Sequence, residues 1–417
     1  MSDTHELIVI GGGVAGAALA CLASRHAPGL RVALVESRPT EPFEPSREYD
    51  LRVSAVSRAS QYILGACGAW PAIRDTRVSP YREMRVWDAR GDPHARDTLH
   101  FDSADLGEPD LGHIIENRLM QSALLDVIRD QPAIEVCQPA APVAIDFETA
   151  SVRVTMGDGR MLAGRLVVGA DGGNSLTRRL AGLGTRGWTY RQEAVVSHVR
   201  TTLPHEETAW QRFLPGGPLA LLPLADARSS VVWSAPEARA RELLAMESED
   251  FCAALGEAGD FVLGPIIDAG PRASFPLQAS HAPAYVRARC ALIGDAAHVV
   301  HPLAGQGANL GLLDAAMLAE RISDAIESGE DPGDAATLRR YERSRKGHNL
   351  AMLLALDGTH RLFGSSLTPV ATMRRLGLAA VDRSGPLKRY LAARAMGLRG
   401  ELPRCARRGI DPGSAAA

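Results

Sequence analysis

A glycine-rich turn near the N-terminus constrains the fold of this chain more than any other feature. The turn occupies Gly11–Gly16 (GGGVAG), between an apolar run at 6–10 and an alanine-rich run at 15–25. The first run is typical of a buried strand and the second of a helix, and residues 31–36 predict another strand. The sequence therefore predicts an N-terminal βαβ unit, which is typical of a parallel sheet.

Within this turn, Gly11, Gly13 and Gly16 form a GxGxxG pattern, and Glu36 lies 20 residues after Gly16, at the end of the second predicted strand. The three glycines permit a tight turn, a close approach of the backbone to a ligand, and a close helix–strand contact. An acid at position 36 accepts hydrogen bonds from both hydroxyls of an adenosine ribose and repels a 2′-phosphate. We therefore predict an FAD or NAD site rather than an NADP site. The alternative is a glycine-rich turn without a ligand.

Two further aspartates follow predicted strands. Asp171 and Gly172 come after the predicted strand at 161–169, and Asp295 comes after the one at 289–293. Because ligands of open α/β sheets bind at the carboxyl ends of the strands, we expect these residues to lie close to the dinucleotide.

A second helix start favours FAD over NAD. We expect Asp295 to bond a ribityl hydroxyl, and a helix that starts around Gly307, Ala308 and Asn309 to face the flavin ring, where negative charge develops on reduction. A nicotinamide dinucleotide would have no use for this second site. Since only one GxGxxG turn follows an apolar strand, a nicotinamide donor is expected to visit the flavin transiently.

Composition excludes several other classes of protein. The chain has 417 residues, 46% of them hydrophobic, and a net charge of −3, which predicts two or three globular domains and gives no reason to expect nucleic acid. The six cysteines show no CxxC pair, so neither a disulfide framework nor a zinc site is expected. His298 and His301 lack a third ligand at suitable spacing, so we expect no metal. We interpret His301 as a structural loop histidine, with a bond to the substrate or the flavin as the alternative.

Two uncharged runs, at 7–24 and 296–313, could be mistaken for membrane spans. Glycines interrupt the first, and the second contains two histidines, a glutamine and an asparagine. We therefore expect no membrane-spanning helix and a cytoplasmic protein, with peripheral contact to the inner membrane as a further hypothesis.

These motifs resemble those of a known enzyme family. The resemblance includes the glycine turn with Glu36, Leu51–Ala55 (LRVSA), Gly169–Ser175 (GADGGNS) and Gly294–Gly311 (GDAAHVVHPLAGQGANLG). The chain is similar to the class A flavin-dependent aromatic hydroxylases, and within them to the ubiquinone-biosynthesis hydroxylases of the UbiH/UbiF/UbiI (VisC) type. The resemblance runs nearly end to end, although Gly173 stands where the family more often has alanine.

The resemblance implies an α/β fold. It consists of an FAD-binding Rossmann-like domain of the glutathione-reductase type, an inserted antiparallel β-sheet substrate domain and C-terminal helices. Short alternating runs between 185 and 285 agree with such a sheet. We expect a discontinuous FAD-binding domain at 1–80, 100–184 and 286–350. The substrate domain is expected at 81–99 and 185–285, and a helical, basic segment at 351–417.

The resemblance also implies roles for single residues. Arg52 and Arg118 would contact the flavin side of the cofactor, and Asp171 with Gly172 the dinucleotide and the passing NAD(P)H. Asp295 and the segment Gly307–Asn309 would contact the ribityl chain and the isoalloxazine ring. The implied reaction is hydroxylation of a polyprenylphenol or benzoquinol precursor of ubiquinone by O2, through a flavin C4a-hydroperoxide. No catalytic side chain is assigned, because the cofactor performs the difficult step.

Alternatives to this function stay open from sequence, as does the ring position (C1, C5 or C6). They are a flavoprotein hydroxylase or reductase of another aromatic or isoprenoid, and an FAD-holding, non-catalytic subunit of a biosynthetic complex. The basic C-terminal segment is interpreted as a solvated helical face or as a contact for an anionic membrane or for partner subunits of such a complex. Between Ala371 and Arg408 it has ten basic residues, which are Arg374, Arg375, Arg383, Lys388, Arg389, Arg394, Arg399, Arg404, Arg407 and Arg408.

Overall fold

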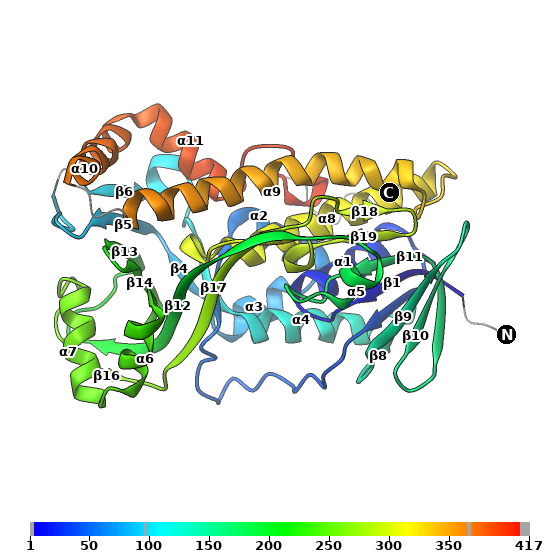
Figure 1. Ribbon diagram of the computed structural model, residues 1–417, viewed down its shortest axis with the longest axis horizontal. Coiled ribbons are helices and arrows are strands. Elements are labelled where there is room, and N and C mark those ends of the chain that lie inside the picture. Colours follow the sequence, from blue (N-terminus) through cyan, green and yellow to red (C-terminus); the bar gives the residue numbers. More distant parts are fainter. Residues whose placement is uncertain (1–3, 96–97, 365–367, 409–417) are drawn as a thin grey trace.

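The computed structural model describes residues 4–95, 98–364 and 368–408. In this part of the chain, three sheets and the helices around them form an elongated molecule (Figure 1). The helices are α1 (Val14–His26), α2 (Arg58–Cys67), α3 (Trp70–Thr76), α4 (Asn117–Arg129), α5 (Leu176–Leu180), α6 (Glu237–Ala245), α7 (Ser248–Ala258), α8 (Gln306–Glu327), α9 (Ala335–Gly364), α10 (Thr368–Arg383) and α11 (Gly385–Ala395).

The first sheet contains the predicted βαβ unit. Its central strands β11, β1 and β2 are parallel, and α1 connects β1 to β2. The strand order is β18-β19-β11-β1-β2-β8, and β10 and β9 extend it from β11. The strands are β1 (Thr4–Ile10), β2 (Val32–Val35), β8 (Ile134–Cys137), β9 (Pro142–Phe147), β10 (Val152–Met156), β11 (Met161–Gly169), β18 (Val286–Arg287) and β19 (Cys290–Leu292).

Return of the chain to this sheet makes the first domain discontinuous. Strand β19 pairs in parallel with β11, although more than 120 residues separate them in sequence. Helices α1 and α8 then pack against each other through buried alanine and leucine side chains. The carboxyl ends of β1, β11 and β19 therefore lie at one edge of the sheet.

The second sheet is the predicted β-rich insertion. It has the order β20-β17-β12-β15-β14-β13-β5-β6, with β16 beside β12. Most pairs are antiparallel, whereas β13 and β5 are parallel. The strands are β5 (Glu83–Asp88), β6 (Leu99–Asp102), β12 (Arg186–Thr201), β13 (Thr208–Leu214), β14 (Gly217–Pro223), β15 (Ser229–Pro236), β16 (Ile266–Ala269), β17 (Ala273–His281) and β20 (His298–Val299).

Side chains alternate between the two faces of this sheet. Val195, Trp233 and Leu221 point to one face, where they pack against α6 and α7 in a hydrophobic cluster. Val196, Val232 and Ala220 belong to the opposite face, which we call the inner face and which borders cavities. The small third sheet, β3 (Val53–Ser57), β7 (Gly112–Glu116) and β4 (Ser79–Tyr81), connects the two domains.

Three details differ from the predicted domain bounds. Strand β6 reaches Asp102, beyond the predicted bound at 99, because it pairs with β5. Strand β20 belongs to the second sheet, although it falls within 286–350. The predicted bound between 350 and 351 falls inside α9, which runs unbroken along much of the molecule (Figure 1).

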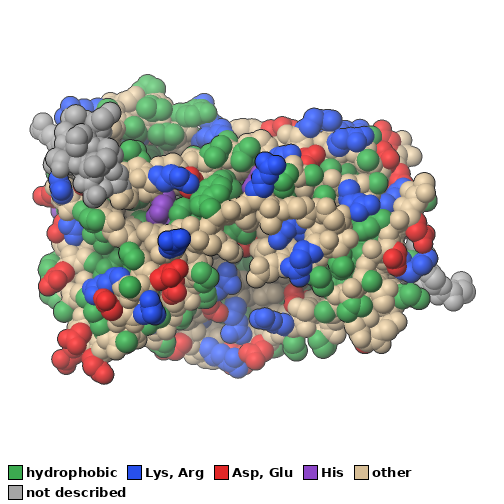
Figure 2. Space-filling model, in the orientation of Figure 1, with side chains coloured by type: hydrophobic (Ala, Val, Ile, Leu, Met, Phe, Trp, Pro, Cys, Tyr) green, Lys and Arg blue, Asp and Glu red, His purple; other side chains and the backbone are tan. Residues whose placement is uncertain are grey.

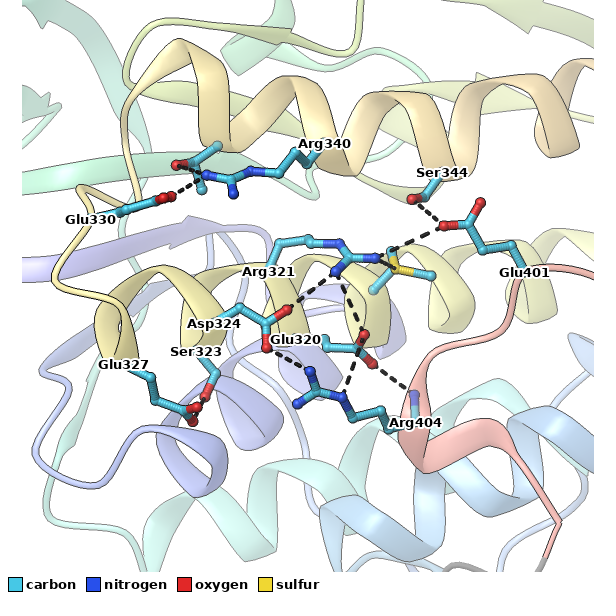
Figure 3. A network of polar contacts seen from close by, with 12 residues as sticks. Glu320, Arg321, Ser323, Asp324, Glu327, Glu330, Arg340, Ser344, Glu401 and Arg404 are labelled. Carbon is cyan, nitrogen blue, oxygen red and sulfur yellow. Dashed lines mark hydrogen bonds and ion pairs between the residues drawn. The ribbon is translucent and has the colours of Figure 1, made fainter.

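The C-terminal segment returns to the first domain through ion pairs. Arg404, in the short helix η4 (Arg404–Ala406), donates its backbone N–H to Glu320 of α8 at 2.7 Å and pairs with Asp324 at 2.8 Å. Figure 3 shows Arg321 beside them, between Asp324 and Glu401. No helix of the described residues is long and apolar enough to cross a membrane.

Candidate functional site

A cavity of about 620 Å³ lies between the edge of the first sheet and the inner face of the second. This volume is within the range of about 300–1,000 Å³ that is usual for small-molecule sites. The cavity brings together residues from across the chain, and seven of the predicted site residues line it: Gly13, Arg52, Arg118, Gly172, Asp295, Gly307 and Ala308.

The glycine turn forms one end of this cavity. A Cβ atom on Gly16 would lie 1.9 Å from the carbonyl oxygen of Gly11, and one on Gly11 would lie 2.4 Å from that of Ala170. At Gly13, in contrast, no protein atom lies within 4 Å of such a Cβ. Gly11 and Gly16 are therefore required for packing, whereas Gly13 leaves open the space in front of α1 that a pyrophosphate would fill.

Glu36 lies beside the turn but does not line the cavity. Its Oε2 accepts a hydrogen bond from the N–H of Gly12 at 2.8 Å, and its Oε1 accepts one from the N–H of Arg38 at 3.0 Å. Gln121 donates to the carbonyl of Gly12 from the other side. The carboxylate is thus fixed at the end of β2, where the ribose of a bound dinucleotide is expected.

Asp295 presents its carboxylate to the cavity. The residue is accessible from the cavity, and its carboxylate accepts no hydrogen bond from the described residues. Its enclosed surroundings raise the pKa of Asp295, and the charges of His298 and Arg52 oppose this only in part. A carboxylate without a protein donor can accept a hydrogen bond from a ligand hydroxyl, as expected for a ribityl chain.

The positive charge of the cavity comes from two arginines. Arg52 lies over the ring of Phe275, with 5.6 Å between its Cζ and the ring centroid. Arg118 pairs with Glu41 at 3.4 Å and with Asp50 at 4.0 Å. On one face of the molecule, Lys and Arg side chains gather around a central hollow (Figure 2). The N-termini of α1 and α8 add the positive ends of two helix dipoles. Together with the two arginines, they suit an anionic dinucleotide.

Asp171 and Asn309 do not line the cavity; their side chains form hydrogen bonds with residues of the surrounding elements. The carboxylate of Asp171 accepts hydrogen bonds from the N–H and the hydroxyl of Thr177, at the start of α5. The amide of Asn309 donates to Ala55 at 2.8 Å and accepts from the N–H of Ser57 at 2.9 Å. Asn309 therefore connects the first turn of α8 to β3, and contact of either side chain with the cofactor stays a prediction.

Asp314 is a site residue that sequence reasoning missed. Its buried carboxylate accepts hydrogen bonds from four donors, which are His298 Nε2 (2.6 Å), Arg345 Nε (2.7 Å), Asn349 Nδ2 (3.0 Å) and the N–H of Gly294 (3.1 Å). Burial would raise the pKa of Asp314, but His298 and Arg345 hold it below its ordinary value. The available signal was a charged residue on the apolar side of α8, between Leu310 and Met317. Because Gly294 precedes Asp295, this network positions the cavity aspartate.

The two histidines of the loop each bind the protein through one ring nitrogen, while His298 Nδ1 and His301 Nε2 are buried without a partner among the described residues. His298 binds Asp314, and His301 accepts a hydrogen bond from the N–H of Leu303 at 3.2 Å. The ring of His301 packs against Tyr190 and His360, with centroids 4.9 and 4.6 Å away. Burial and the neighbouring His360 lower the pKa of His301 to about 3. Neither histidine is among the residues that line this cavity, and the role of His301 stays a prediction.

A second, apolar cavity of about 180 Å³ adjoins the first. Both are bordered by Val53, Val232, Pro302 and Gly305. From this junction the apolar cavity extends along the inner face of the second sheet to Ala392 and Met396, at the end of α11. A ligand in the apolar cavity would thus lie between the cofactor site and the C-terminal helices.

Comparisons with known proteins agree with this geometry. A family model described as FAD binding domain matches residues 4–354. A "Ubiquinone hydroxylase UbiL" of Rhodospirillum rubrum is 40% identical, over 94% of this chain and 89% of the relative. A "Ubiquinone biosynthesis monooxygenase COQ6, mitochondrial" of Rattus norvegicus is 37% identical, over 94% and 90%. A "3-demethoxyubiquinol 3-hydroxylase" of Escherichia coli is 35% identical, over 94% and 98%.

Among solved structures, a p-nitrophenol 4-monooxygenase from Pseudomonas putida aligns with a TM-score of 0.76. The alignment covers 95% of this chain and 99% of the other, at 19% identity. At this identity the likeness shows the fold.

Proposed function

This chain belongs to the FAD binding domain family and, within it, to the hydroxylases of ubiquinone biosynthesis, and we propose that it hydroxylates the ring of a polyprenylphenol or benzoquinol intermediate. The observation that carries the proposal is the junction of the two cavities. The cavity with the features of a dinucleotide site meets the apolar cavity at Val53, Val232 and Gly305. The apolar cavity, of about 180 Å³, suits the aromatic ring of a lipid-like substrate, and from there the ring can reach the first cavity.

The residues of the first cavity fit FAD. The open space at Gly13 suits the pyrophosphate, Glu36 lies at the expected ribose position, and Asp295 offers a free acceptor to the ribityl chain. Bound FAD supplies the redox chemistry, in which NAD(P)H is the electron donor and O2 the oxidant.

The protein's own residues contribute binding, orientation and exclusion of water. The start of α8, at Gly307 and Ala308, offers a positive dipole end to the flavin ring. The apolar lining of the second cavity keeps water away from the reacting centre and holds the aromatic ring against it. Because the cofactor would supply the redox chemistry and the protein binding and orientation, no side-chain acid–base pair is needed where the two cavities meet.

Oxygen consumption tests this function. We expect the purified, FAD-loaded protein to consume O2 with NAD(P)H, and a polyprenylphenol to stimulate the rate. An oxygen electrode and mass spectrometry of the extracted quinol measure both quantities. Stimulation without a hydroxylated product would instead indicate another aromatic or isoprenoid substrate. A yellow protein without any NAD(P)H-dependent O2 uptake would indicate a non-catalytic FAD-holding subunit. Expression in strains that each lack one ring hydroxylase would then identify the position attacked.

We further propose that α11 contacts an anionic membrane surface. Several of the basic residues first considered for this role form ion pairs within the protein. Arg374 is buried and pairs with Asp88 at 2.8 Å, Arg404 pairs with Asp324, and Arg408 pairs with Glu108. Arg375 lies among residues whose side chains the structure does not describe. Charge reversal at Arg374 would therefore disturb the fold rather than test membrane binding.

Helix α11 presents exposed apolar side chains that could make such a contact. Leu387, Tyr390 and Leu391 are exposed on one side of it, and the exposed Arg389 lines a surface pocket together with Tyr390. Its opposite side, with Ala392 and Met396, lines the apolar cavity. A bilayer against the exposed side would place a membrane-dissolved substrate close to the cavity.

Co-sedimentation with vesicles tests this contact. We expect vesicles that contain phosphatidylserine to pellet part of the protein at low salt, and the double change Leu387→Glu, Leu391→Glu to reduce the pelleted fraction several-fold. The paired control Leu203→Glu, Ile267→Glu also removes exposed apolar side chains, but away from α11, and should pellet as the wild type does. Equal pelleting of all three proteins, or none of the wild type, would contradict the proposal.

A further inference from the structure

The inner face of the second sheet forms one wall of the apolar cavity. This wall is apolar except for two polar side chains. Gln211 of β13 is 5% exposed and Ser234 of β15 is 2% exposed. Both line the cavity, and neither side chain makes a hydrogen bond to the described residues. The polar atoms of both side chains are not among the fully enclosed, unpartnered atoms of the described residues, so they are open to the cavity. A group inside the cavity can therefore supply their hydrogen-bond partner.

A water molecule is the alternative partner in the ligand-free protein. A buried water needs two to four polar contacts. Around Gln211 the cavity is lined by Met84, Phe101 and Ala220, and Ser234 lies two strands away. The other polar side chains of the described lining are Trp210, next to Gln211, and Tyr81 and Gln306, from other elements. An oxygen of a bound ligand would take the place of water at these groups.

The register of the sheet places these two groups relative to the cofactor cavity. Gln211 pairs with Ala220, and Ala220 pairs with Val232, which borders both cavities. Because neighbouring strands lie about 4.8 Å apart, the Cα of Gln211 is about 10 Å from that of Val232. Both side chains leave the same face of the sheet, so the amide of Gln211 and the junction at Val232 border the same cavity. Ser234 lies on the same strand as Val232, two residues further on.

We propose that Gln211 and Ser234 orient the aromatic substrate through hydrogen bonds to oxygen substituents on its ring. This inference rests on the proposed function and names the residues that would decide which ring carbon faces the cofactor. The glutamine amide can donate to a carbonyl or methoxy oxygen and can accept from a hydroxyl. The serine hydroxyl can do the same from the other side of the ring. The apolar remainder of the cavity, toward Ala392 and Met396, is left for the prenyl chain.

A substrate pair that differs by one ring hydroxyl tests this assignment. We expect a short-chain prenylphenol to bind the FAD-loaded wild type about tenfold or more tightly than the matching prenylbenzene, since the latter leaves the polar groups unpaired. Perturbation of the flavin absorbance measures both dissociation constants. Gln211→Met should lose most of this preference. It should also release more hydrogen peroxide per NAD(P)H oxidised, because a loosely held ring is hydroxylated less often.

The stability of the ligand-free variants separates a substrate-positioning role from a structural one. Gln211→Met removes a buried amide without a protein partner, so its Tm should equal or exceed that of the wild type. The matched control is Gln192→Met on β12, where the amide donates to the carbonyl of Gly216 at 2.9 Å away from both cavities. This control should lower Tm and keep the preference for the phenol.

Each outcome bears on one of the two claims. If the wild type responds to neither compound and hydroxylates no polyprenylphenol, the proposed function fails and this inference fails with it. If the wild type discriminates between the compounds but Gln211→Met does so equally well, the inference alone is overturned. A Tm of Gln211→Met as low as that of Gln192→Met would also overturn it, since it would show a structural role.

Discussion

Replacement of Gly13 by valine is expected to abolish FAD binding and to leave the fold intact. Gly13 lies at one end of the cofactor cavity, with φ −69° and ψ 178°, a conformation that valine adopts readily. No protein atom lies within 4 Å of a Cβ at this position. The valine side chain would therefore fill the space in front of α1 that the pyrophosphate needs. We expect FAD affinity to fall by more than about 100-fold, because bulk here also blocks the N–H groups of the helix start.

Two other glycines make this experiment decisive. Gly16→Val, in the same turn, should prevent folding, since its Cβ would lie 1.9 Å from the carbonyl oxygen of Gly11. Gly184→Val, at an exposed position with open space, should change neither the fold nor the cofactor content. Flavin absorbance after gel filtration and circular dichroism give the two readouts. A yellow, folded Gly13→Val protein would show that the cofactor lies elsewhere.

Replacement of Asp314 by asparagine is expected to give a large loss of stability. The change removes a buried negative charge and leaves Arg345, which is fully buried, without its counter-ion. Breaking a buried pair in this way costs about 3–5 kcal/mol of the free energy of unfolding. The loop that carries Asp295 should also loosen, because the N–H of Gly294 loses a charged acceptor, so FAD should bind more weakly.

The pH dependence of this effect has a definite sign. The folded-state pKa of Asp314 lies below its ordinary value of 3.8, so the charge stabilises the fold fully above about pH 4. This stabilisation is lost as the pH falls through the lower, folded-state pKa. Thermal scans between about pH 7 and about pH 3 should therefore show a constant gap in Tm between wild type and Asp314→Asn that narrows only at the acidic end.

A control on the same helix separates this effect from a general loss of charge. Asp324→Asn removes a partly exposed carboxylate that pairs with Arg321 and Arg404 (Figure 3). Such surface pairs contribute about 0.2–1 kcal/mol, so this variant should stay close to the wild type. A Tm for Asp314→Asn equal to that of Asp324→Asn would contradict the role of the buried network.

Local patterns in the sequence were sufficient to predict the parts of the site that depend on the backbone. The GxGxxG turn specifies its own geometry, because only glycine avoids the contacts at Gly11 and Gly16. The strands before Asp171 and Asp295 were predicted from short apolar runs, since a buried parallel strand needs a continuous apolar sequence. Seven of the predicted site residues then line one cavity because strands of a parallel sheet end at the same edge.

The side chains of Asp171 and Asn309 show where such reasoning stops. Both stand at the predicted positions, yet their polar atoms bind Thr177 and Ala55 and hold the cavity walls. A motif shows which residue type is needed at a position, but the direction of its hydrogen bonds depends on neighbours that are distant in sequence. The same holds for Arg374, whose buried partner Asp88 lies on a different domain.

By itself, the sequence determined a dinucleotide-binding βαβ unit and an antiparallel sheet later in the chain, because each is encoded in local runs and short motifs. Its resemblance to a known family indicated the hydroxylase class. Only the tertiary structure decided which groups support and complete the site. Asp314 meets His298 and Arg345 because α8 and α9 pack together. Gln211 faces the apolar cavity because the register of the second sheet places it on the same face as Val232, opposite Ala220. Packing and register join residues far apart in the chain, and no local pattern contains that information.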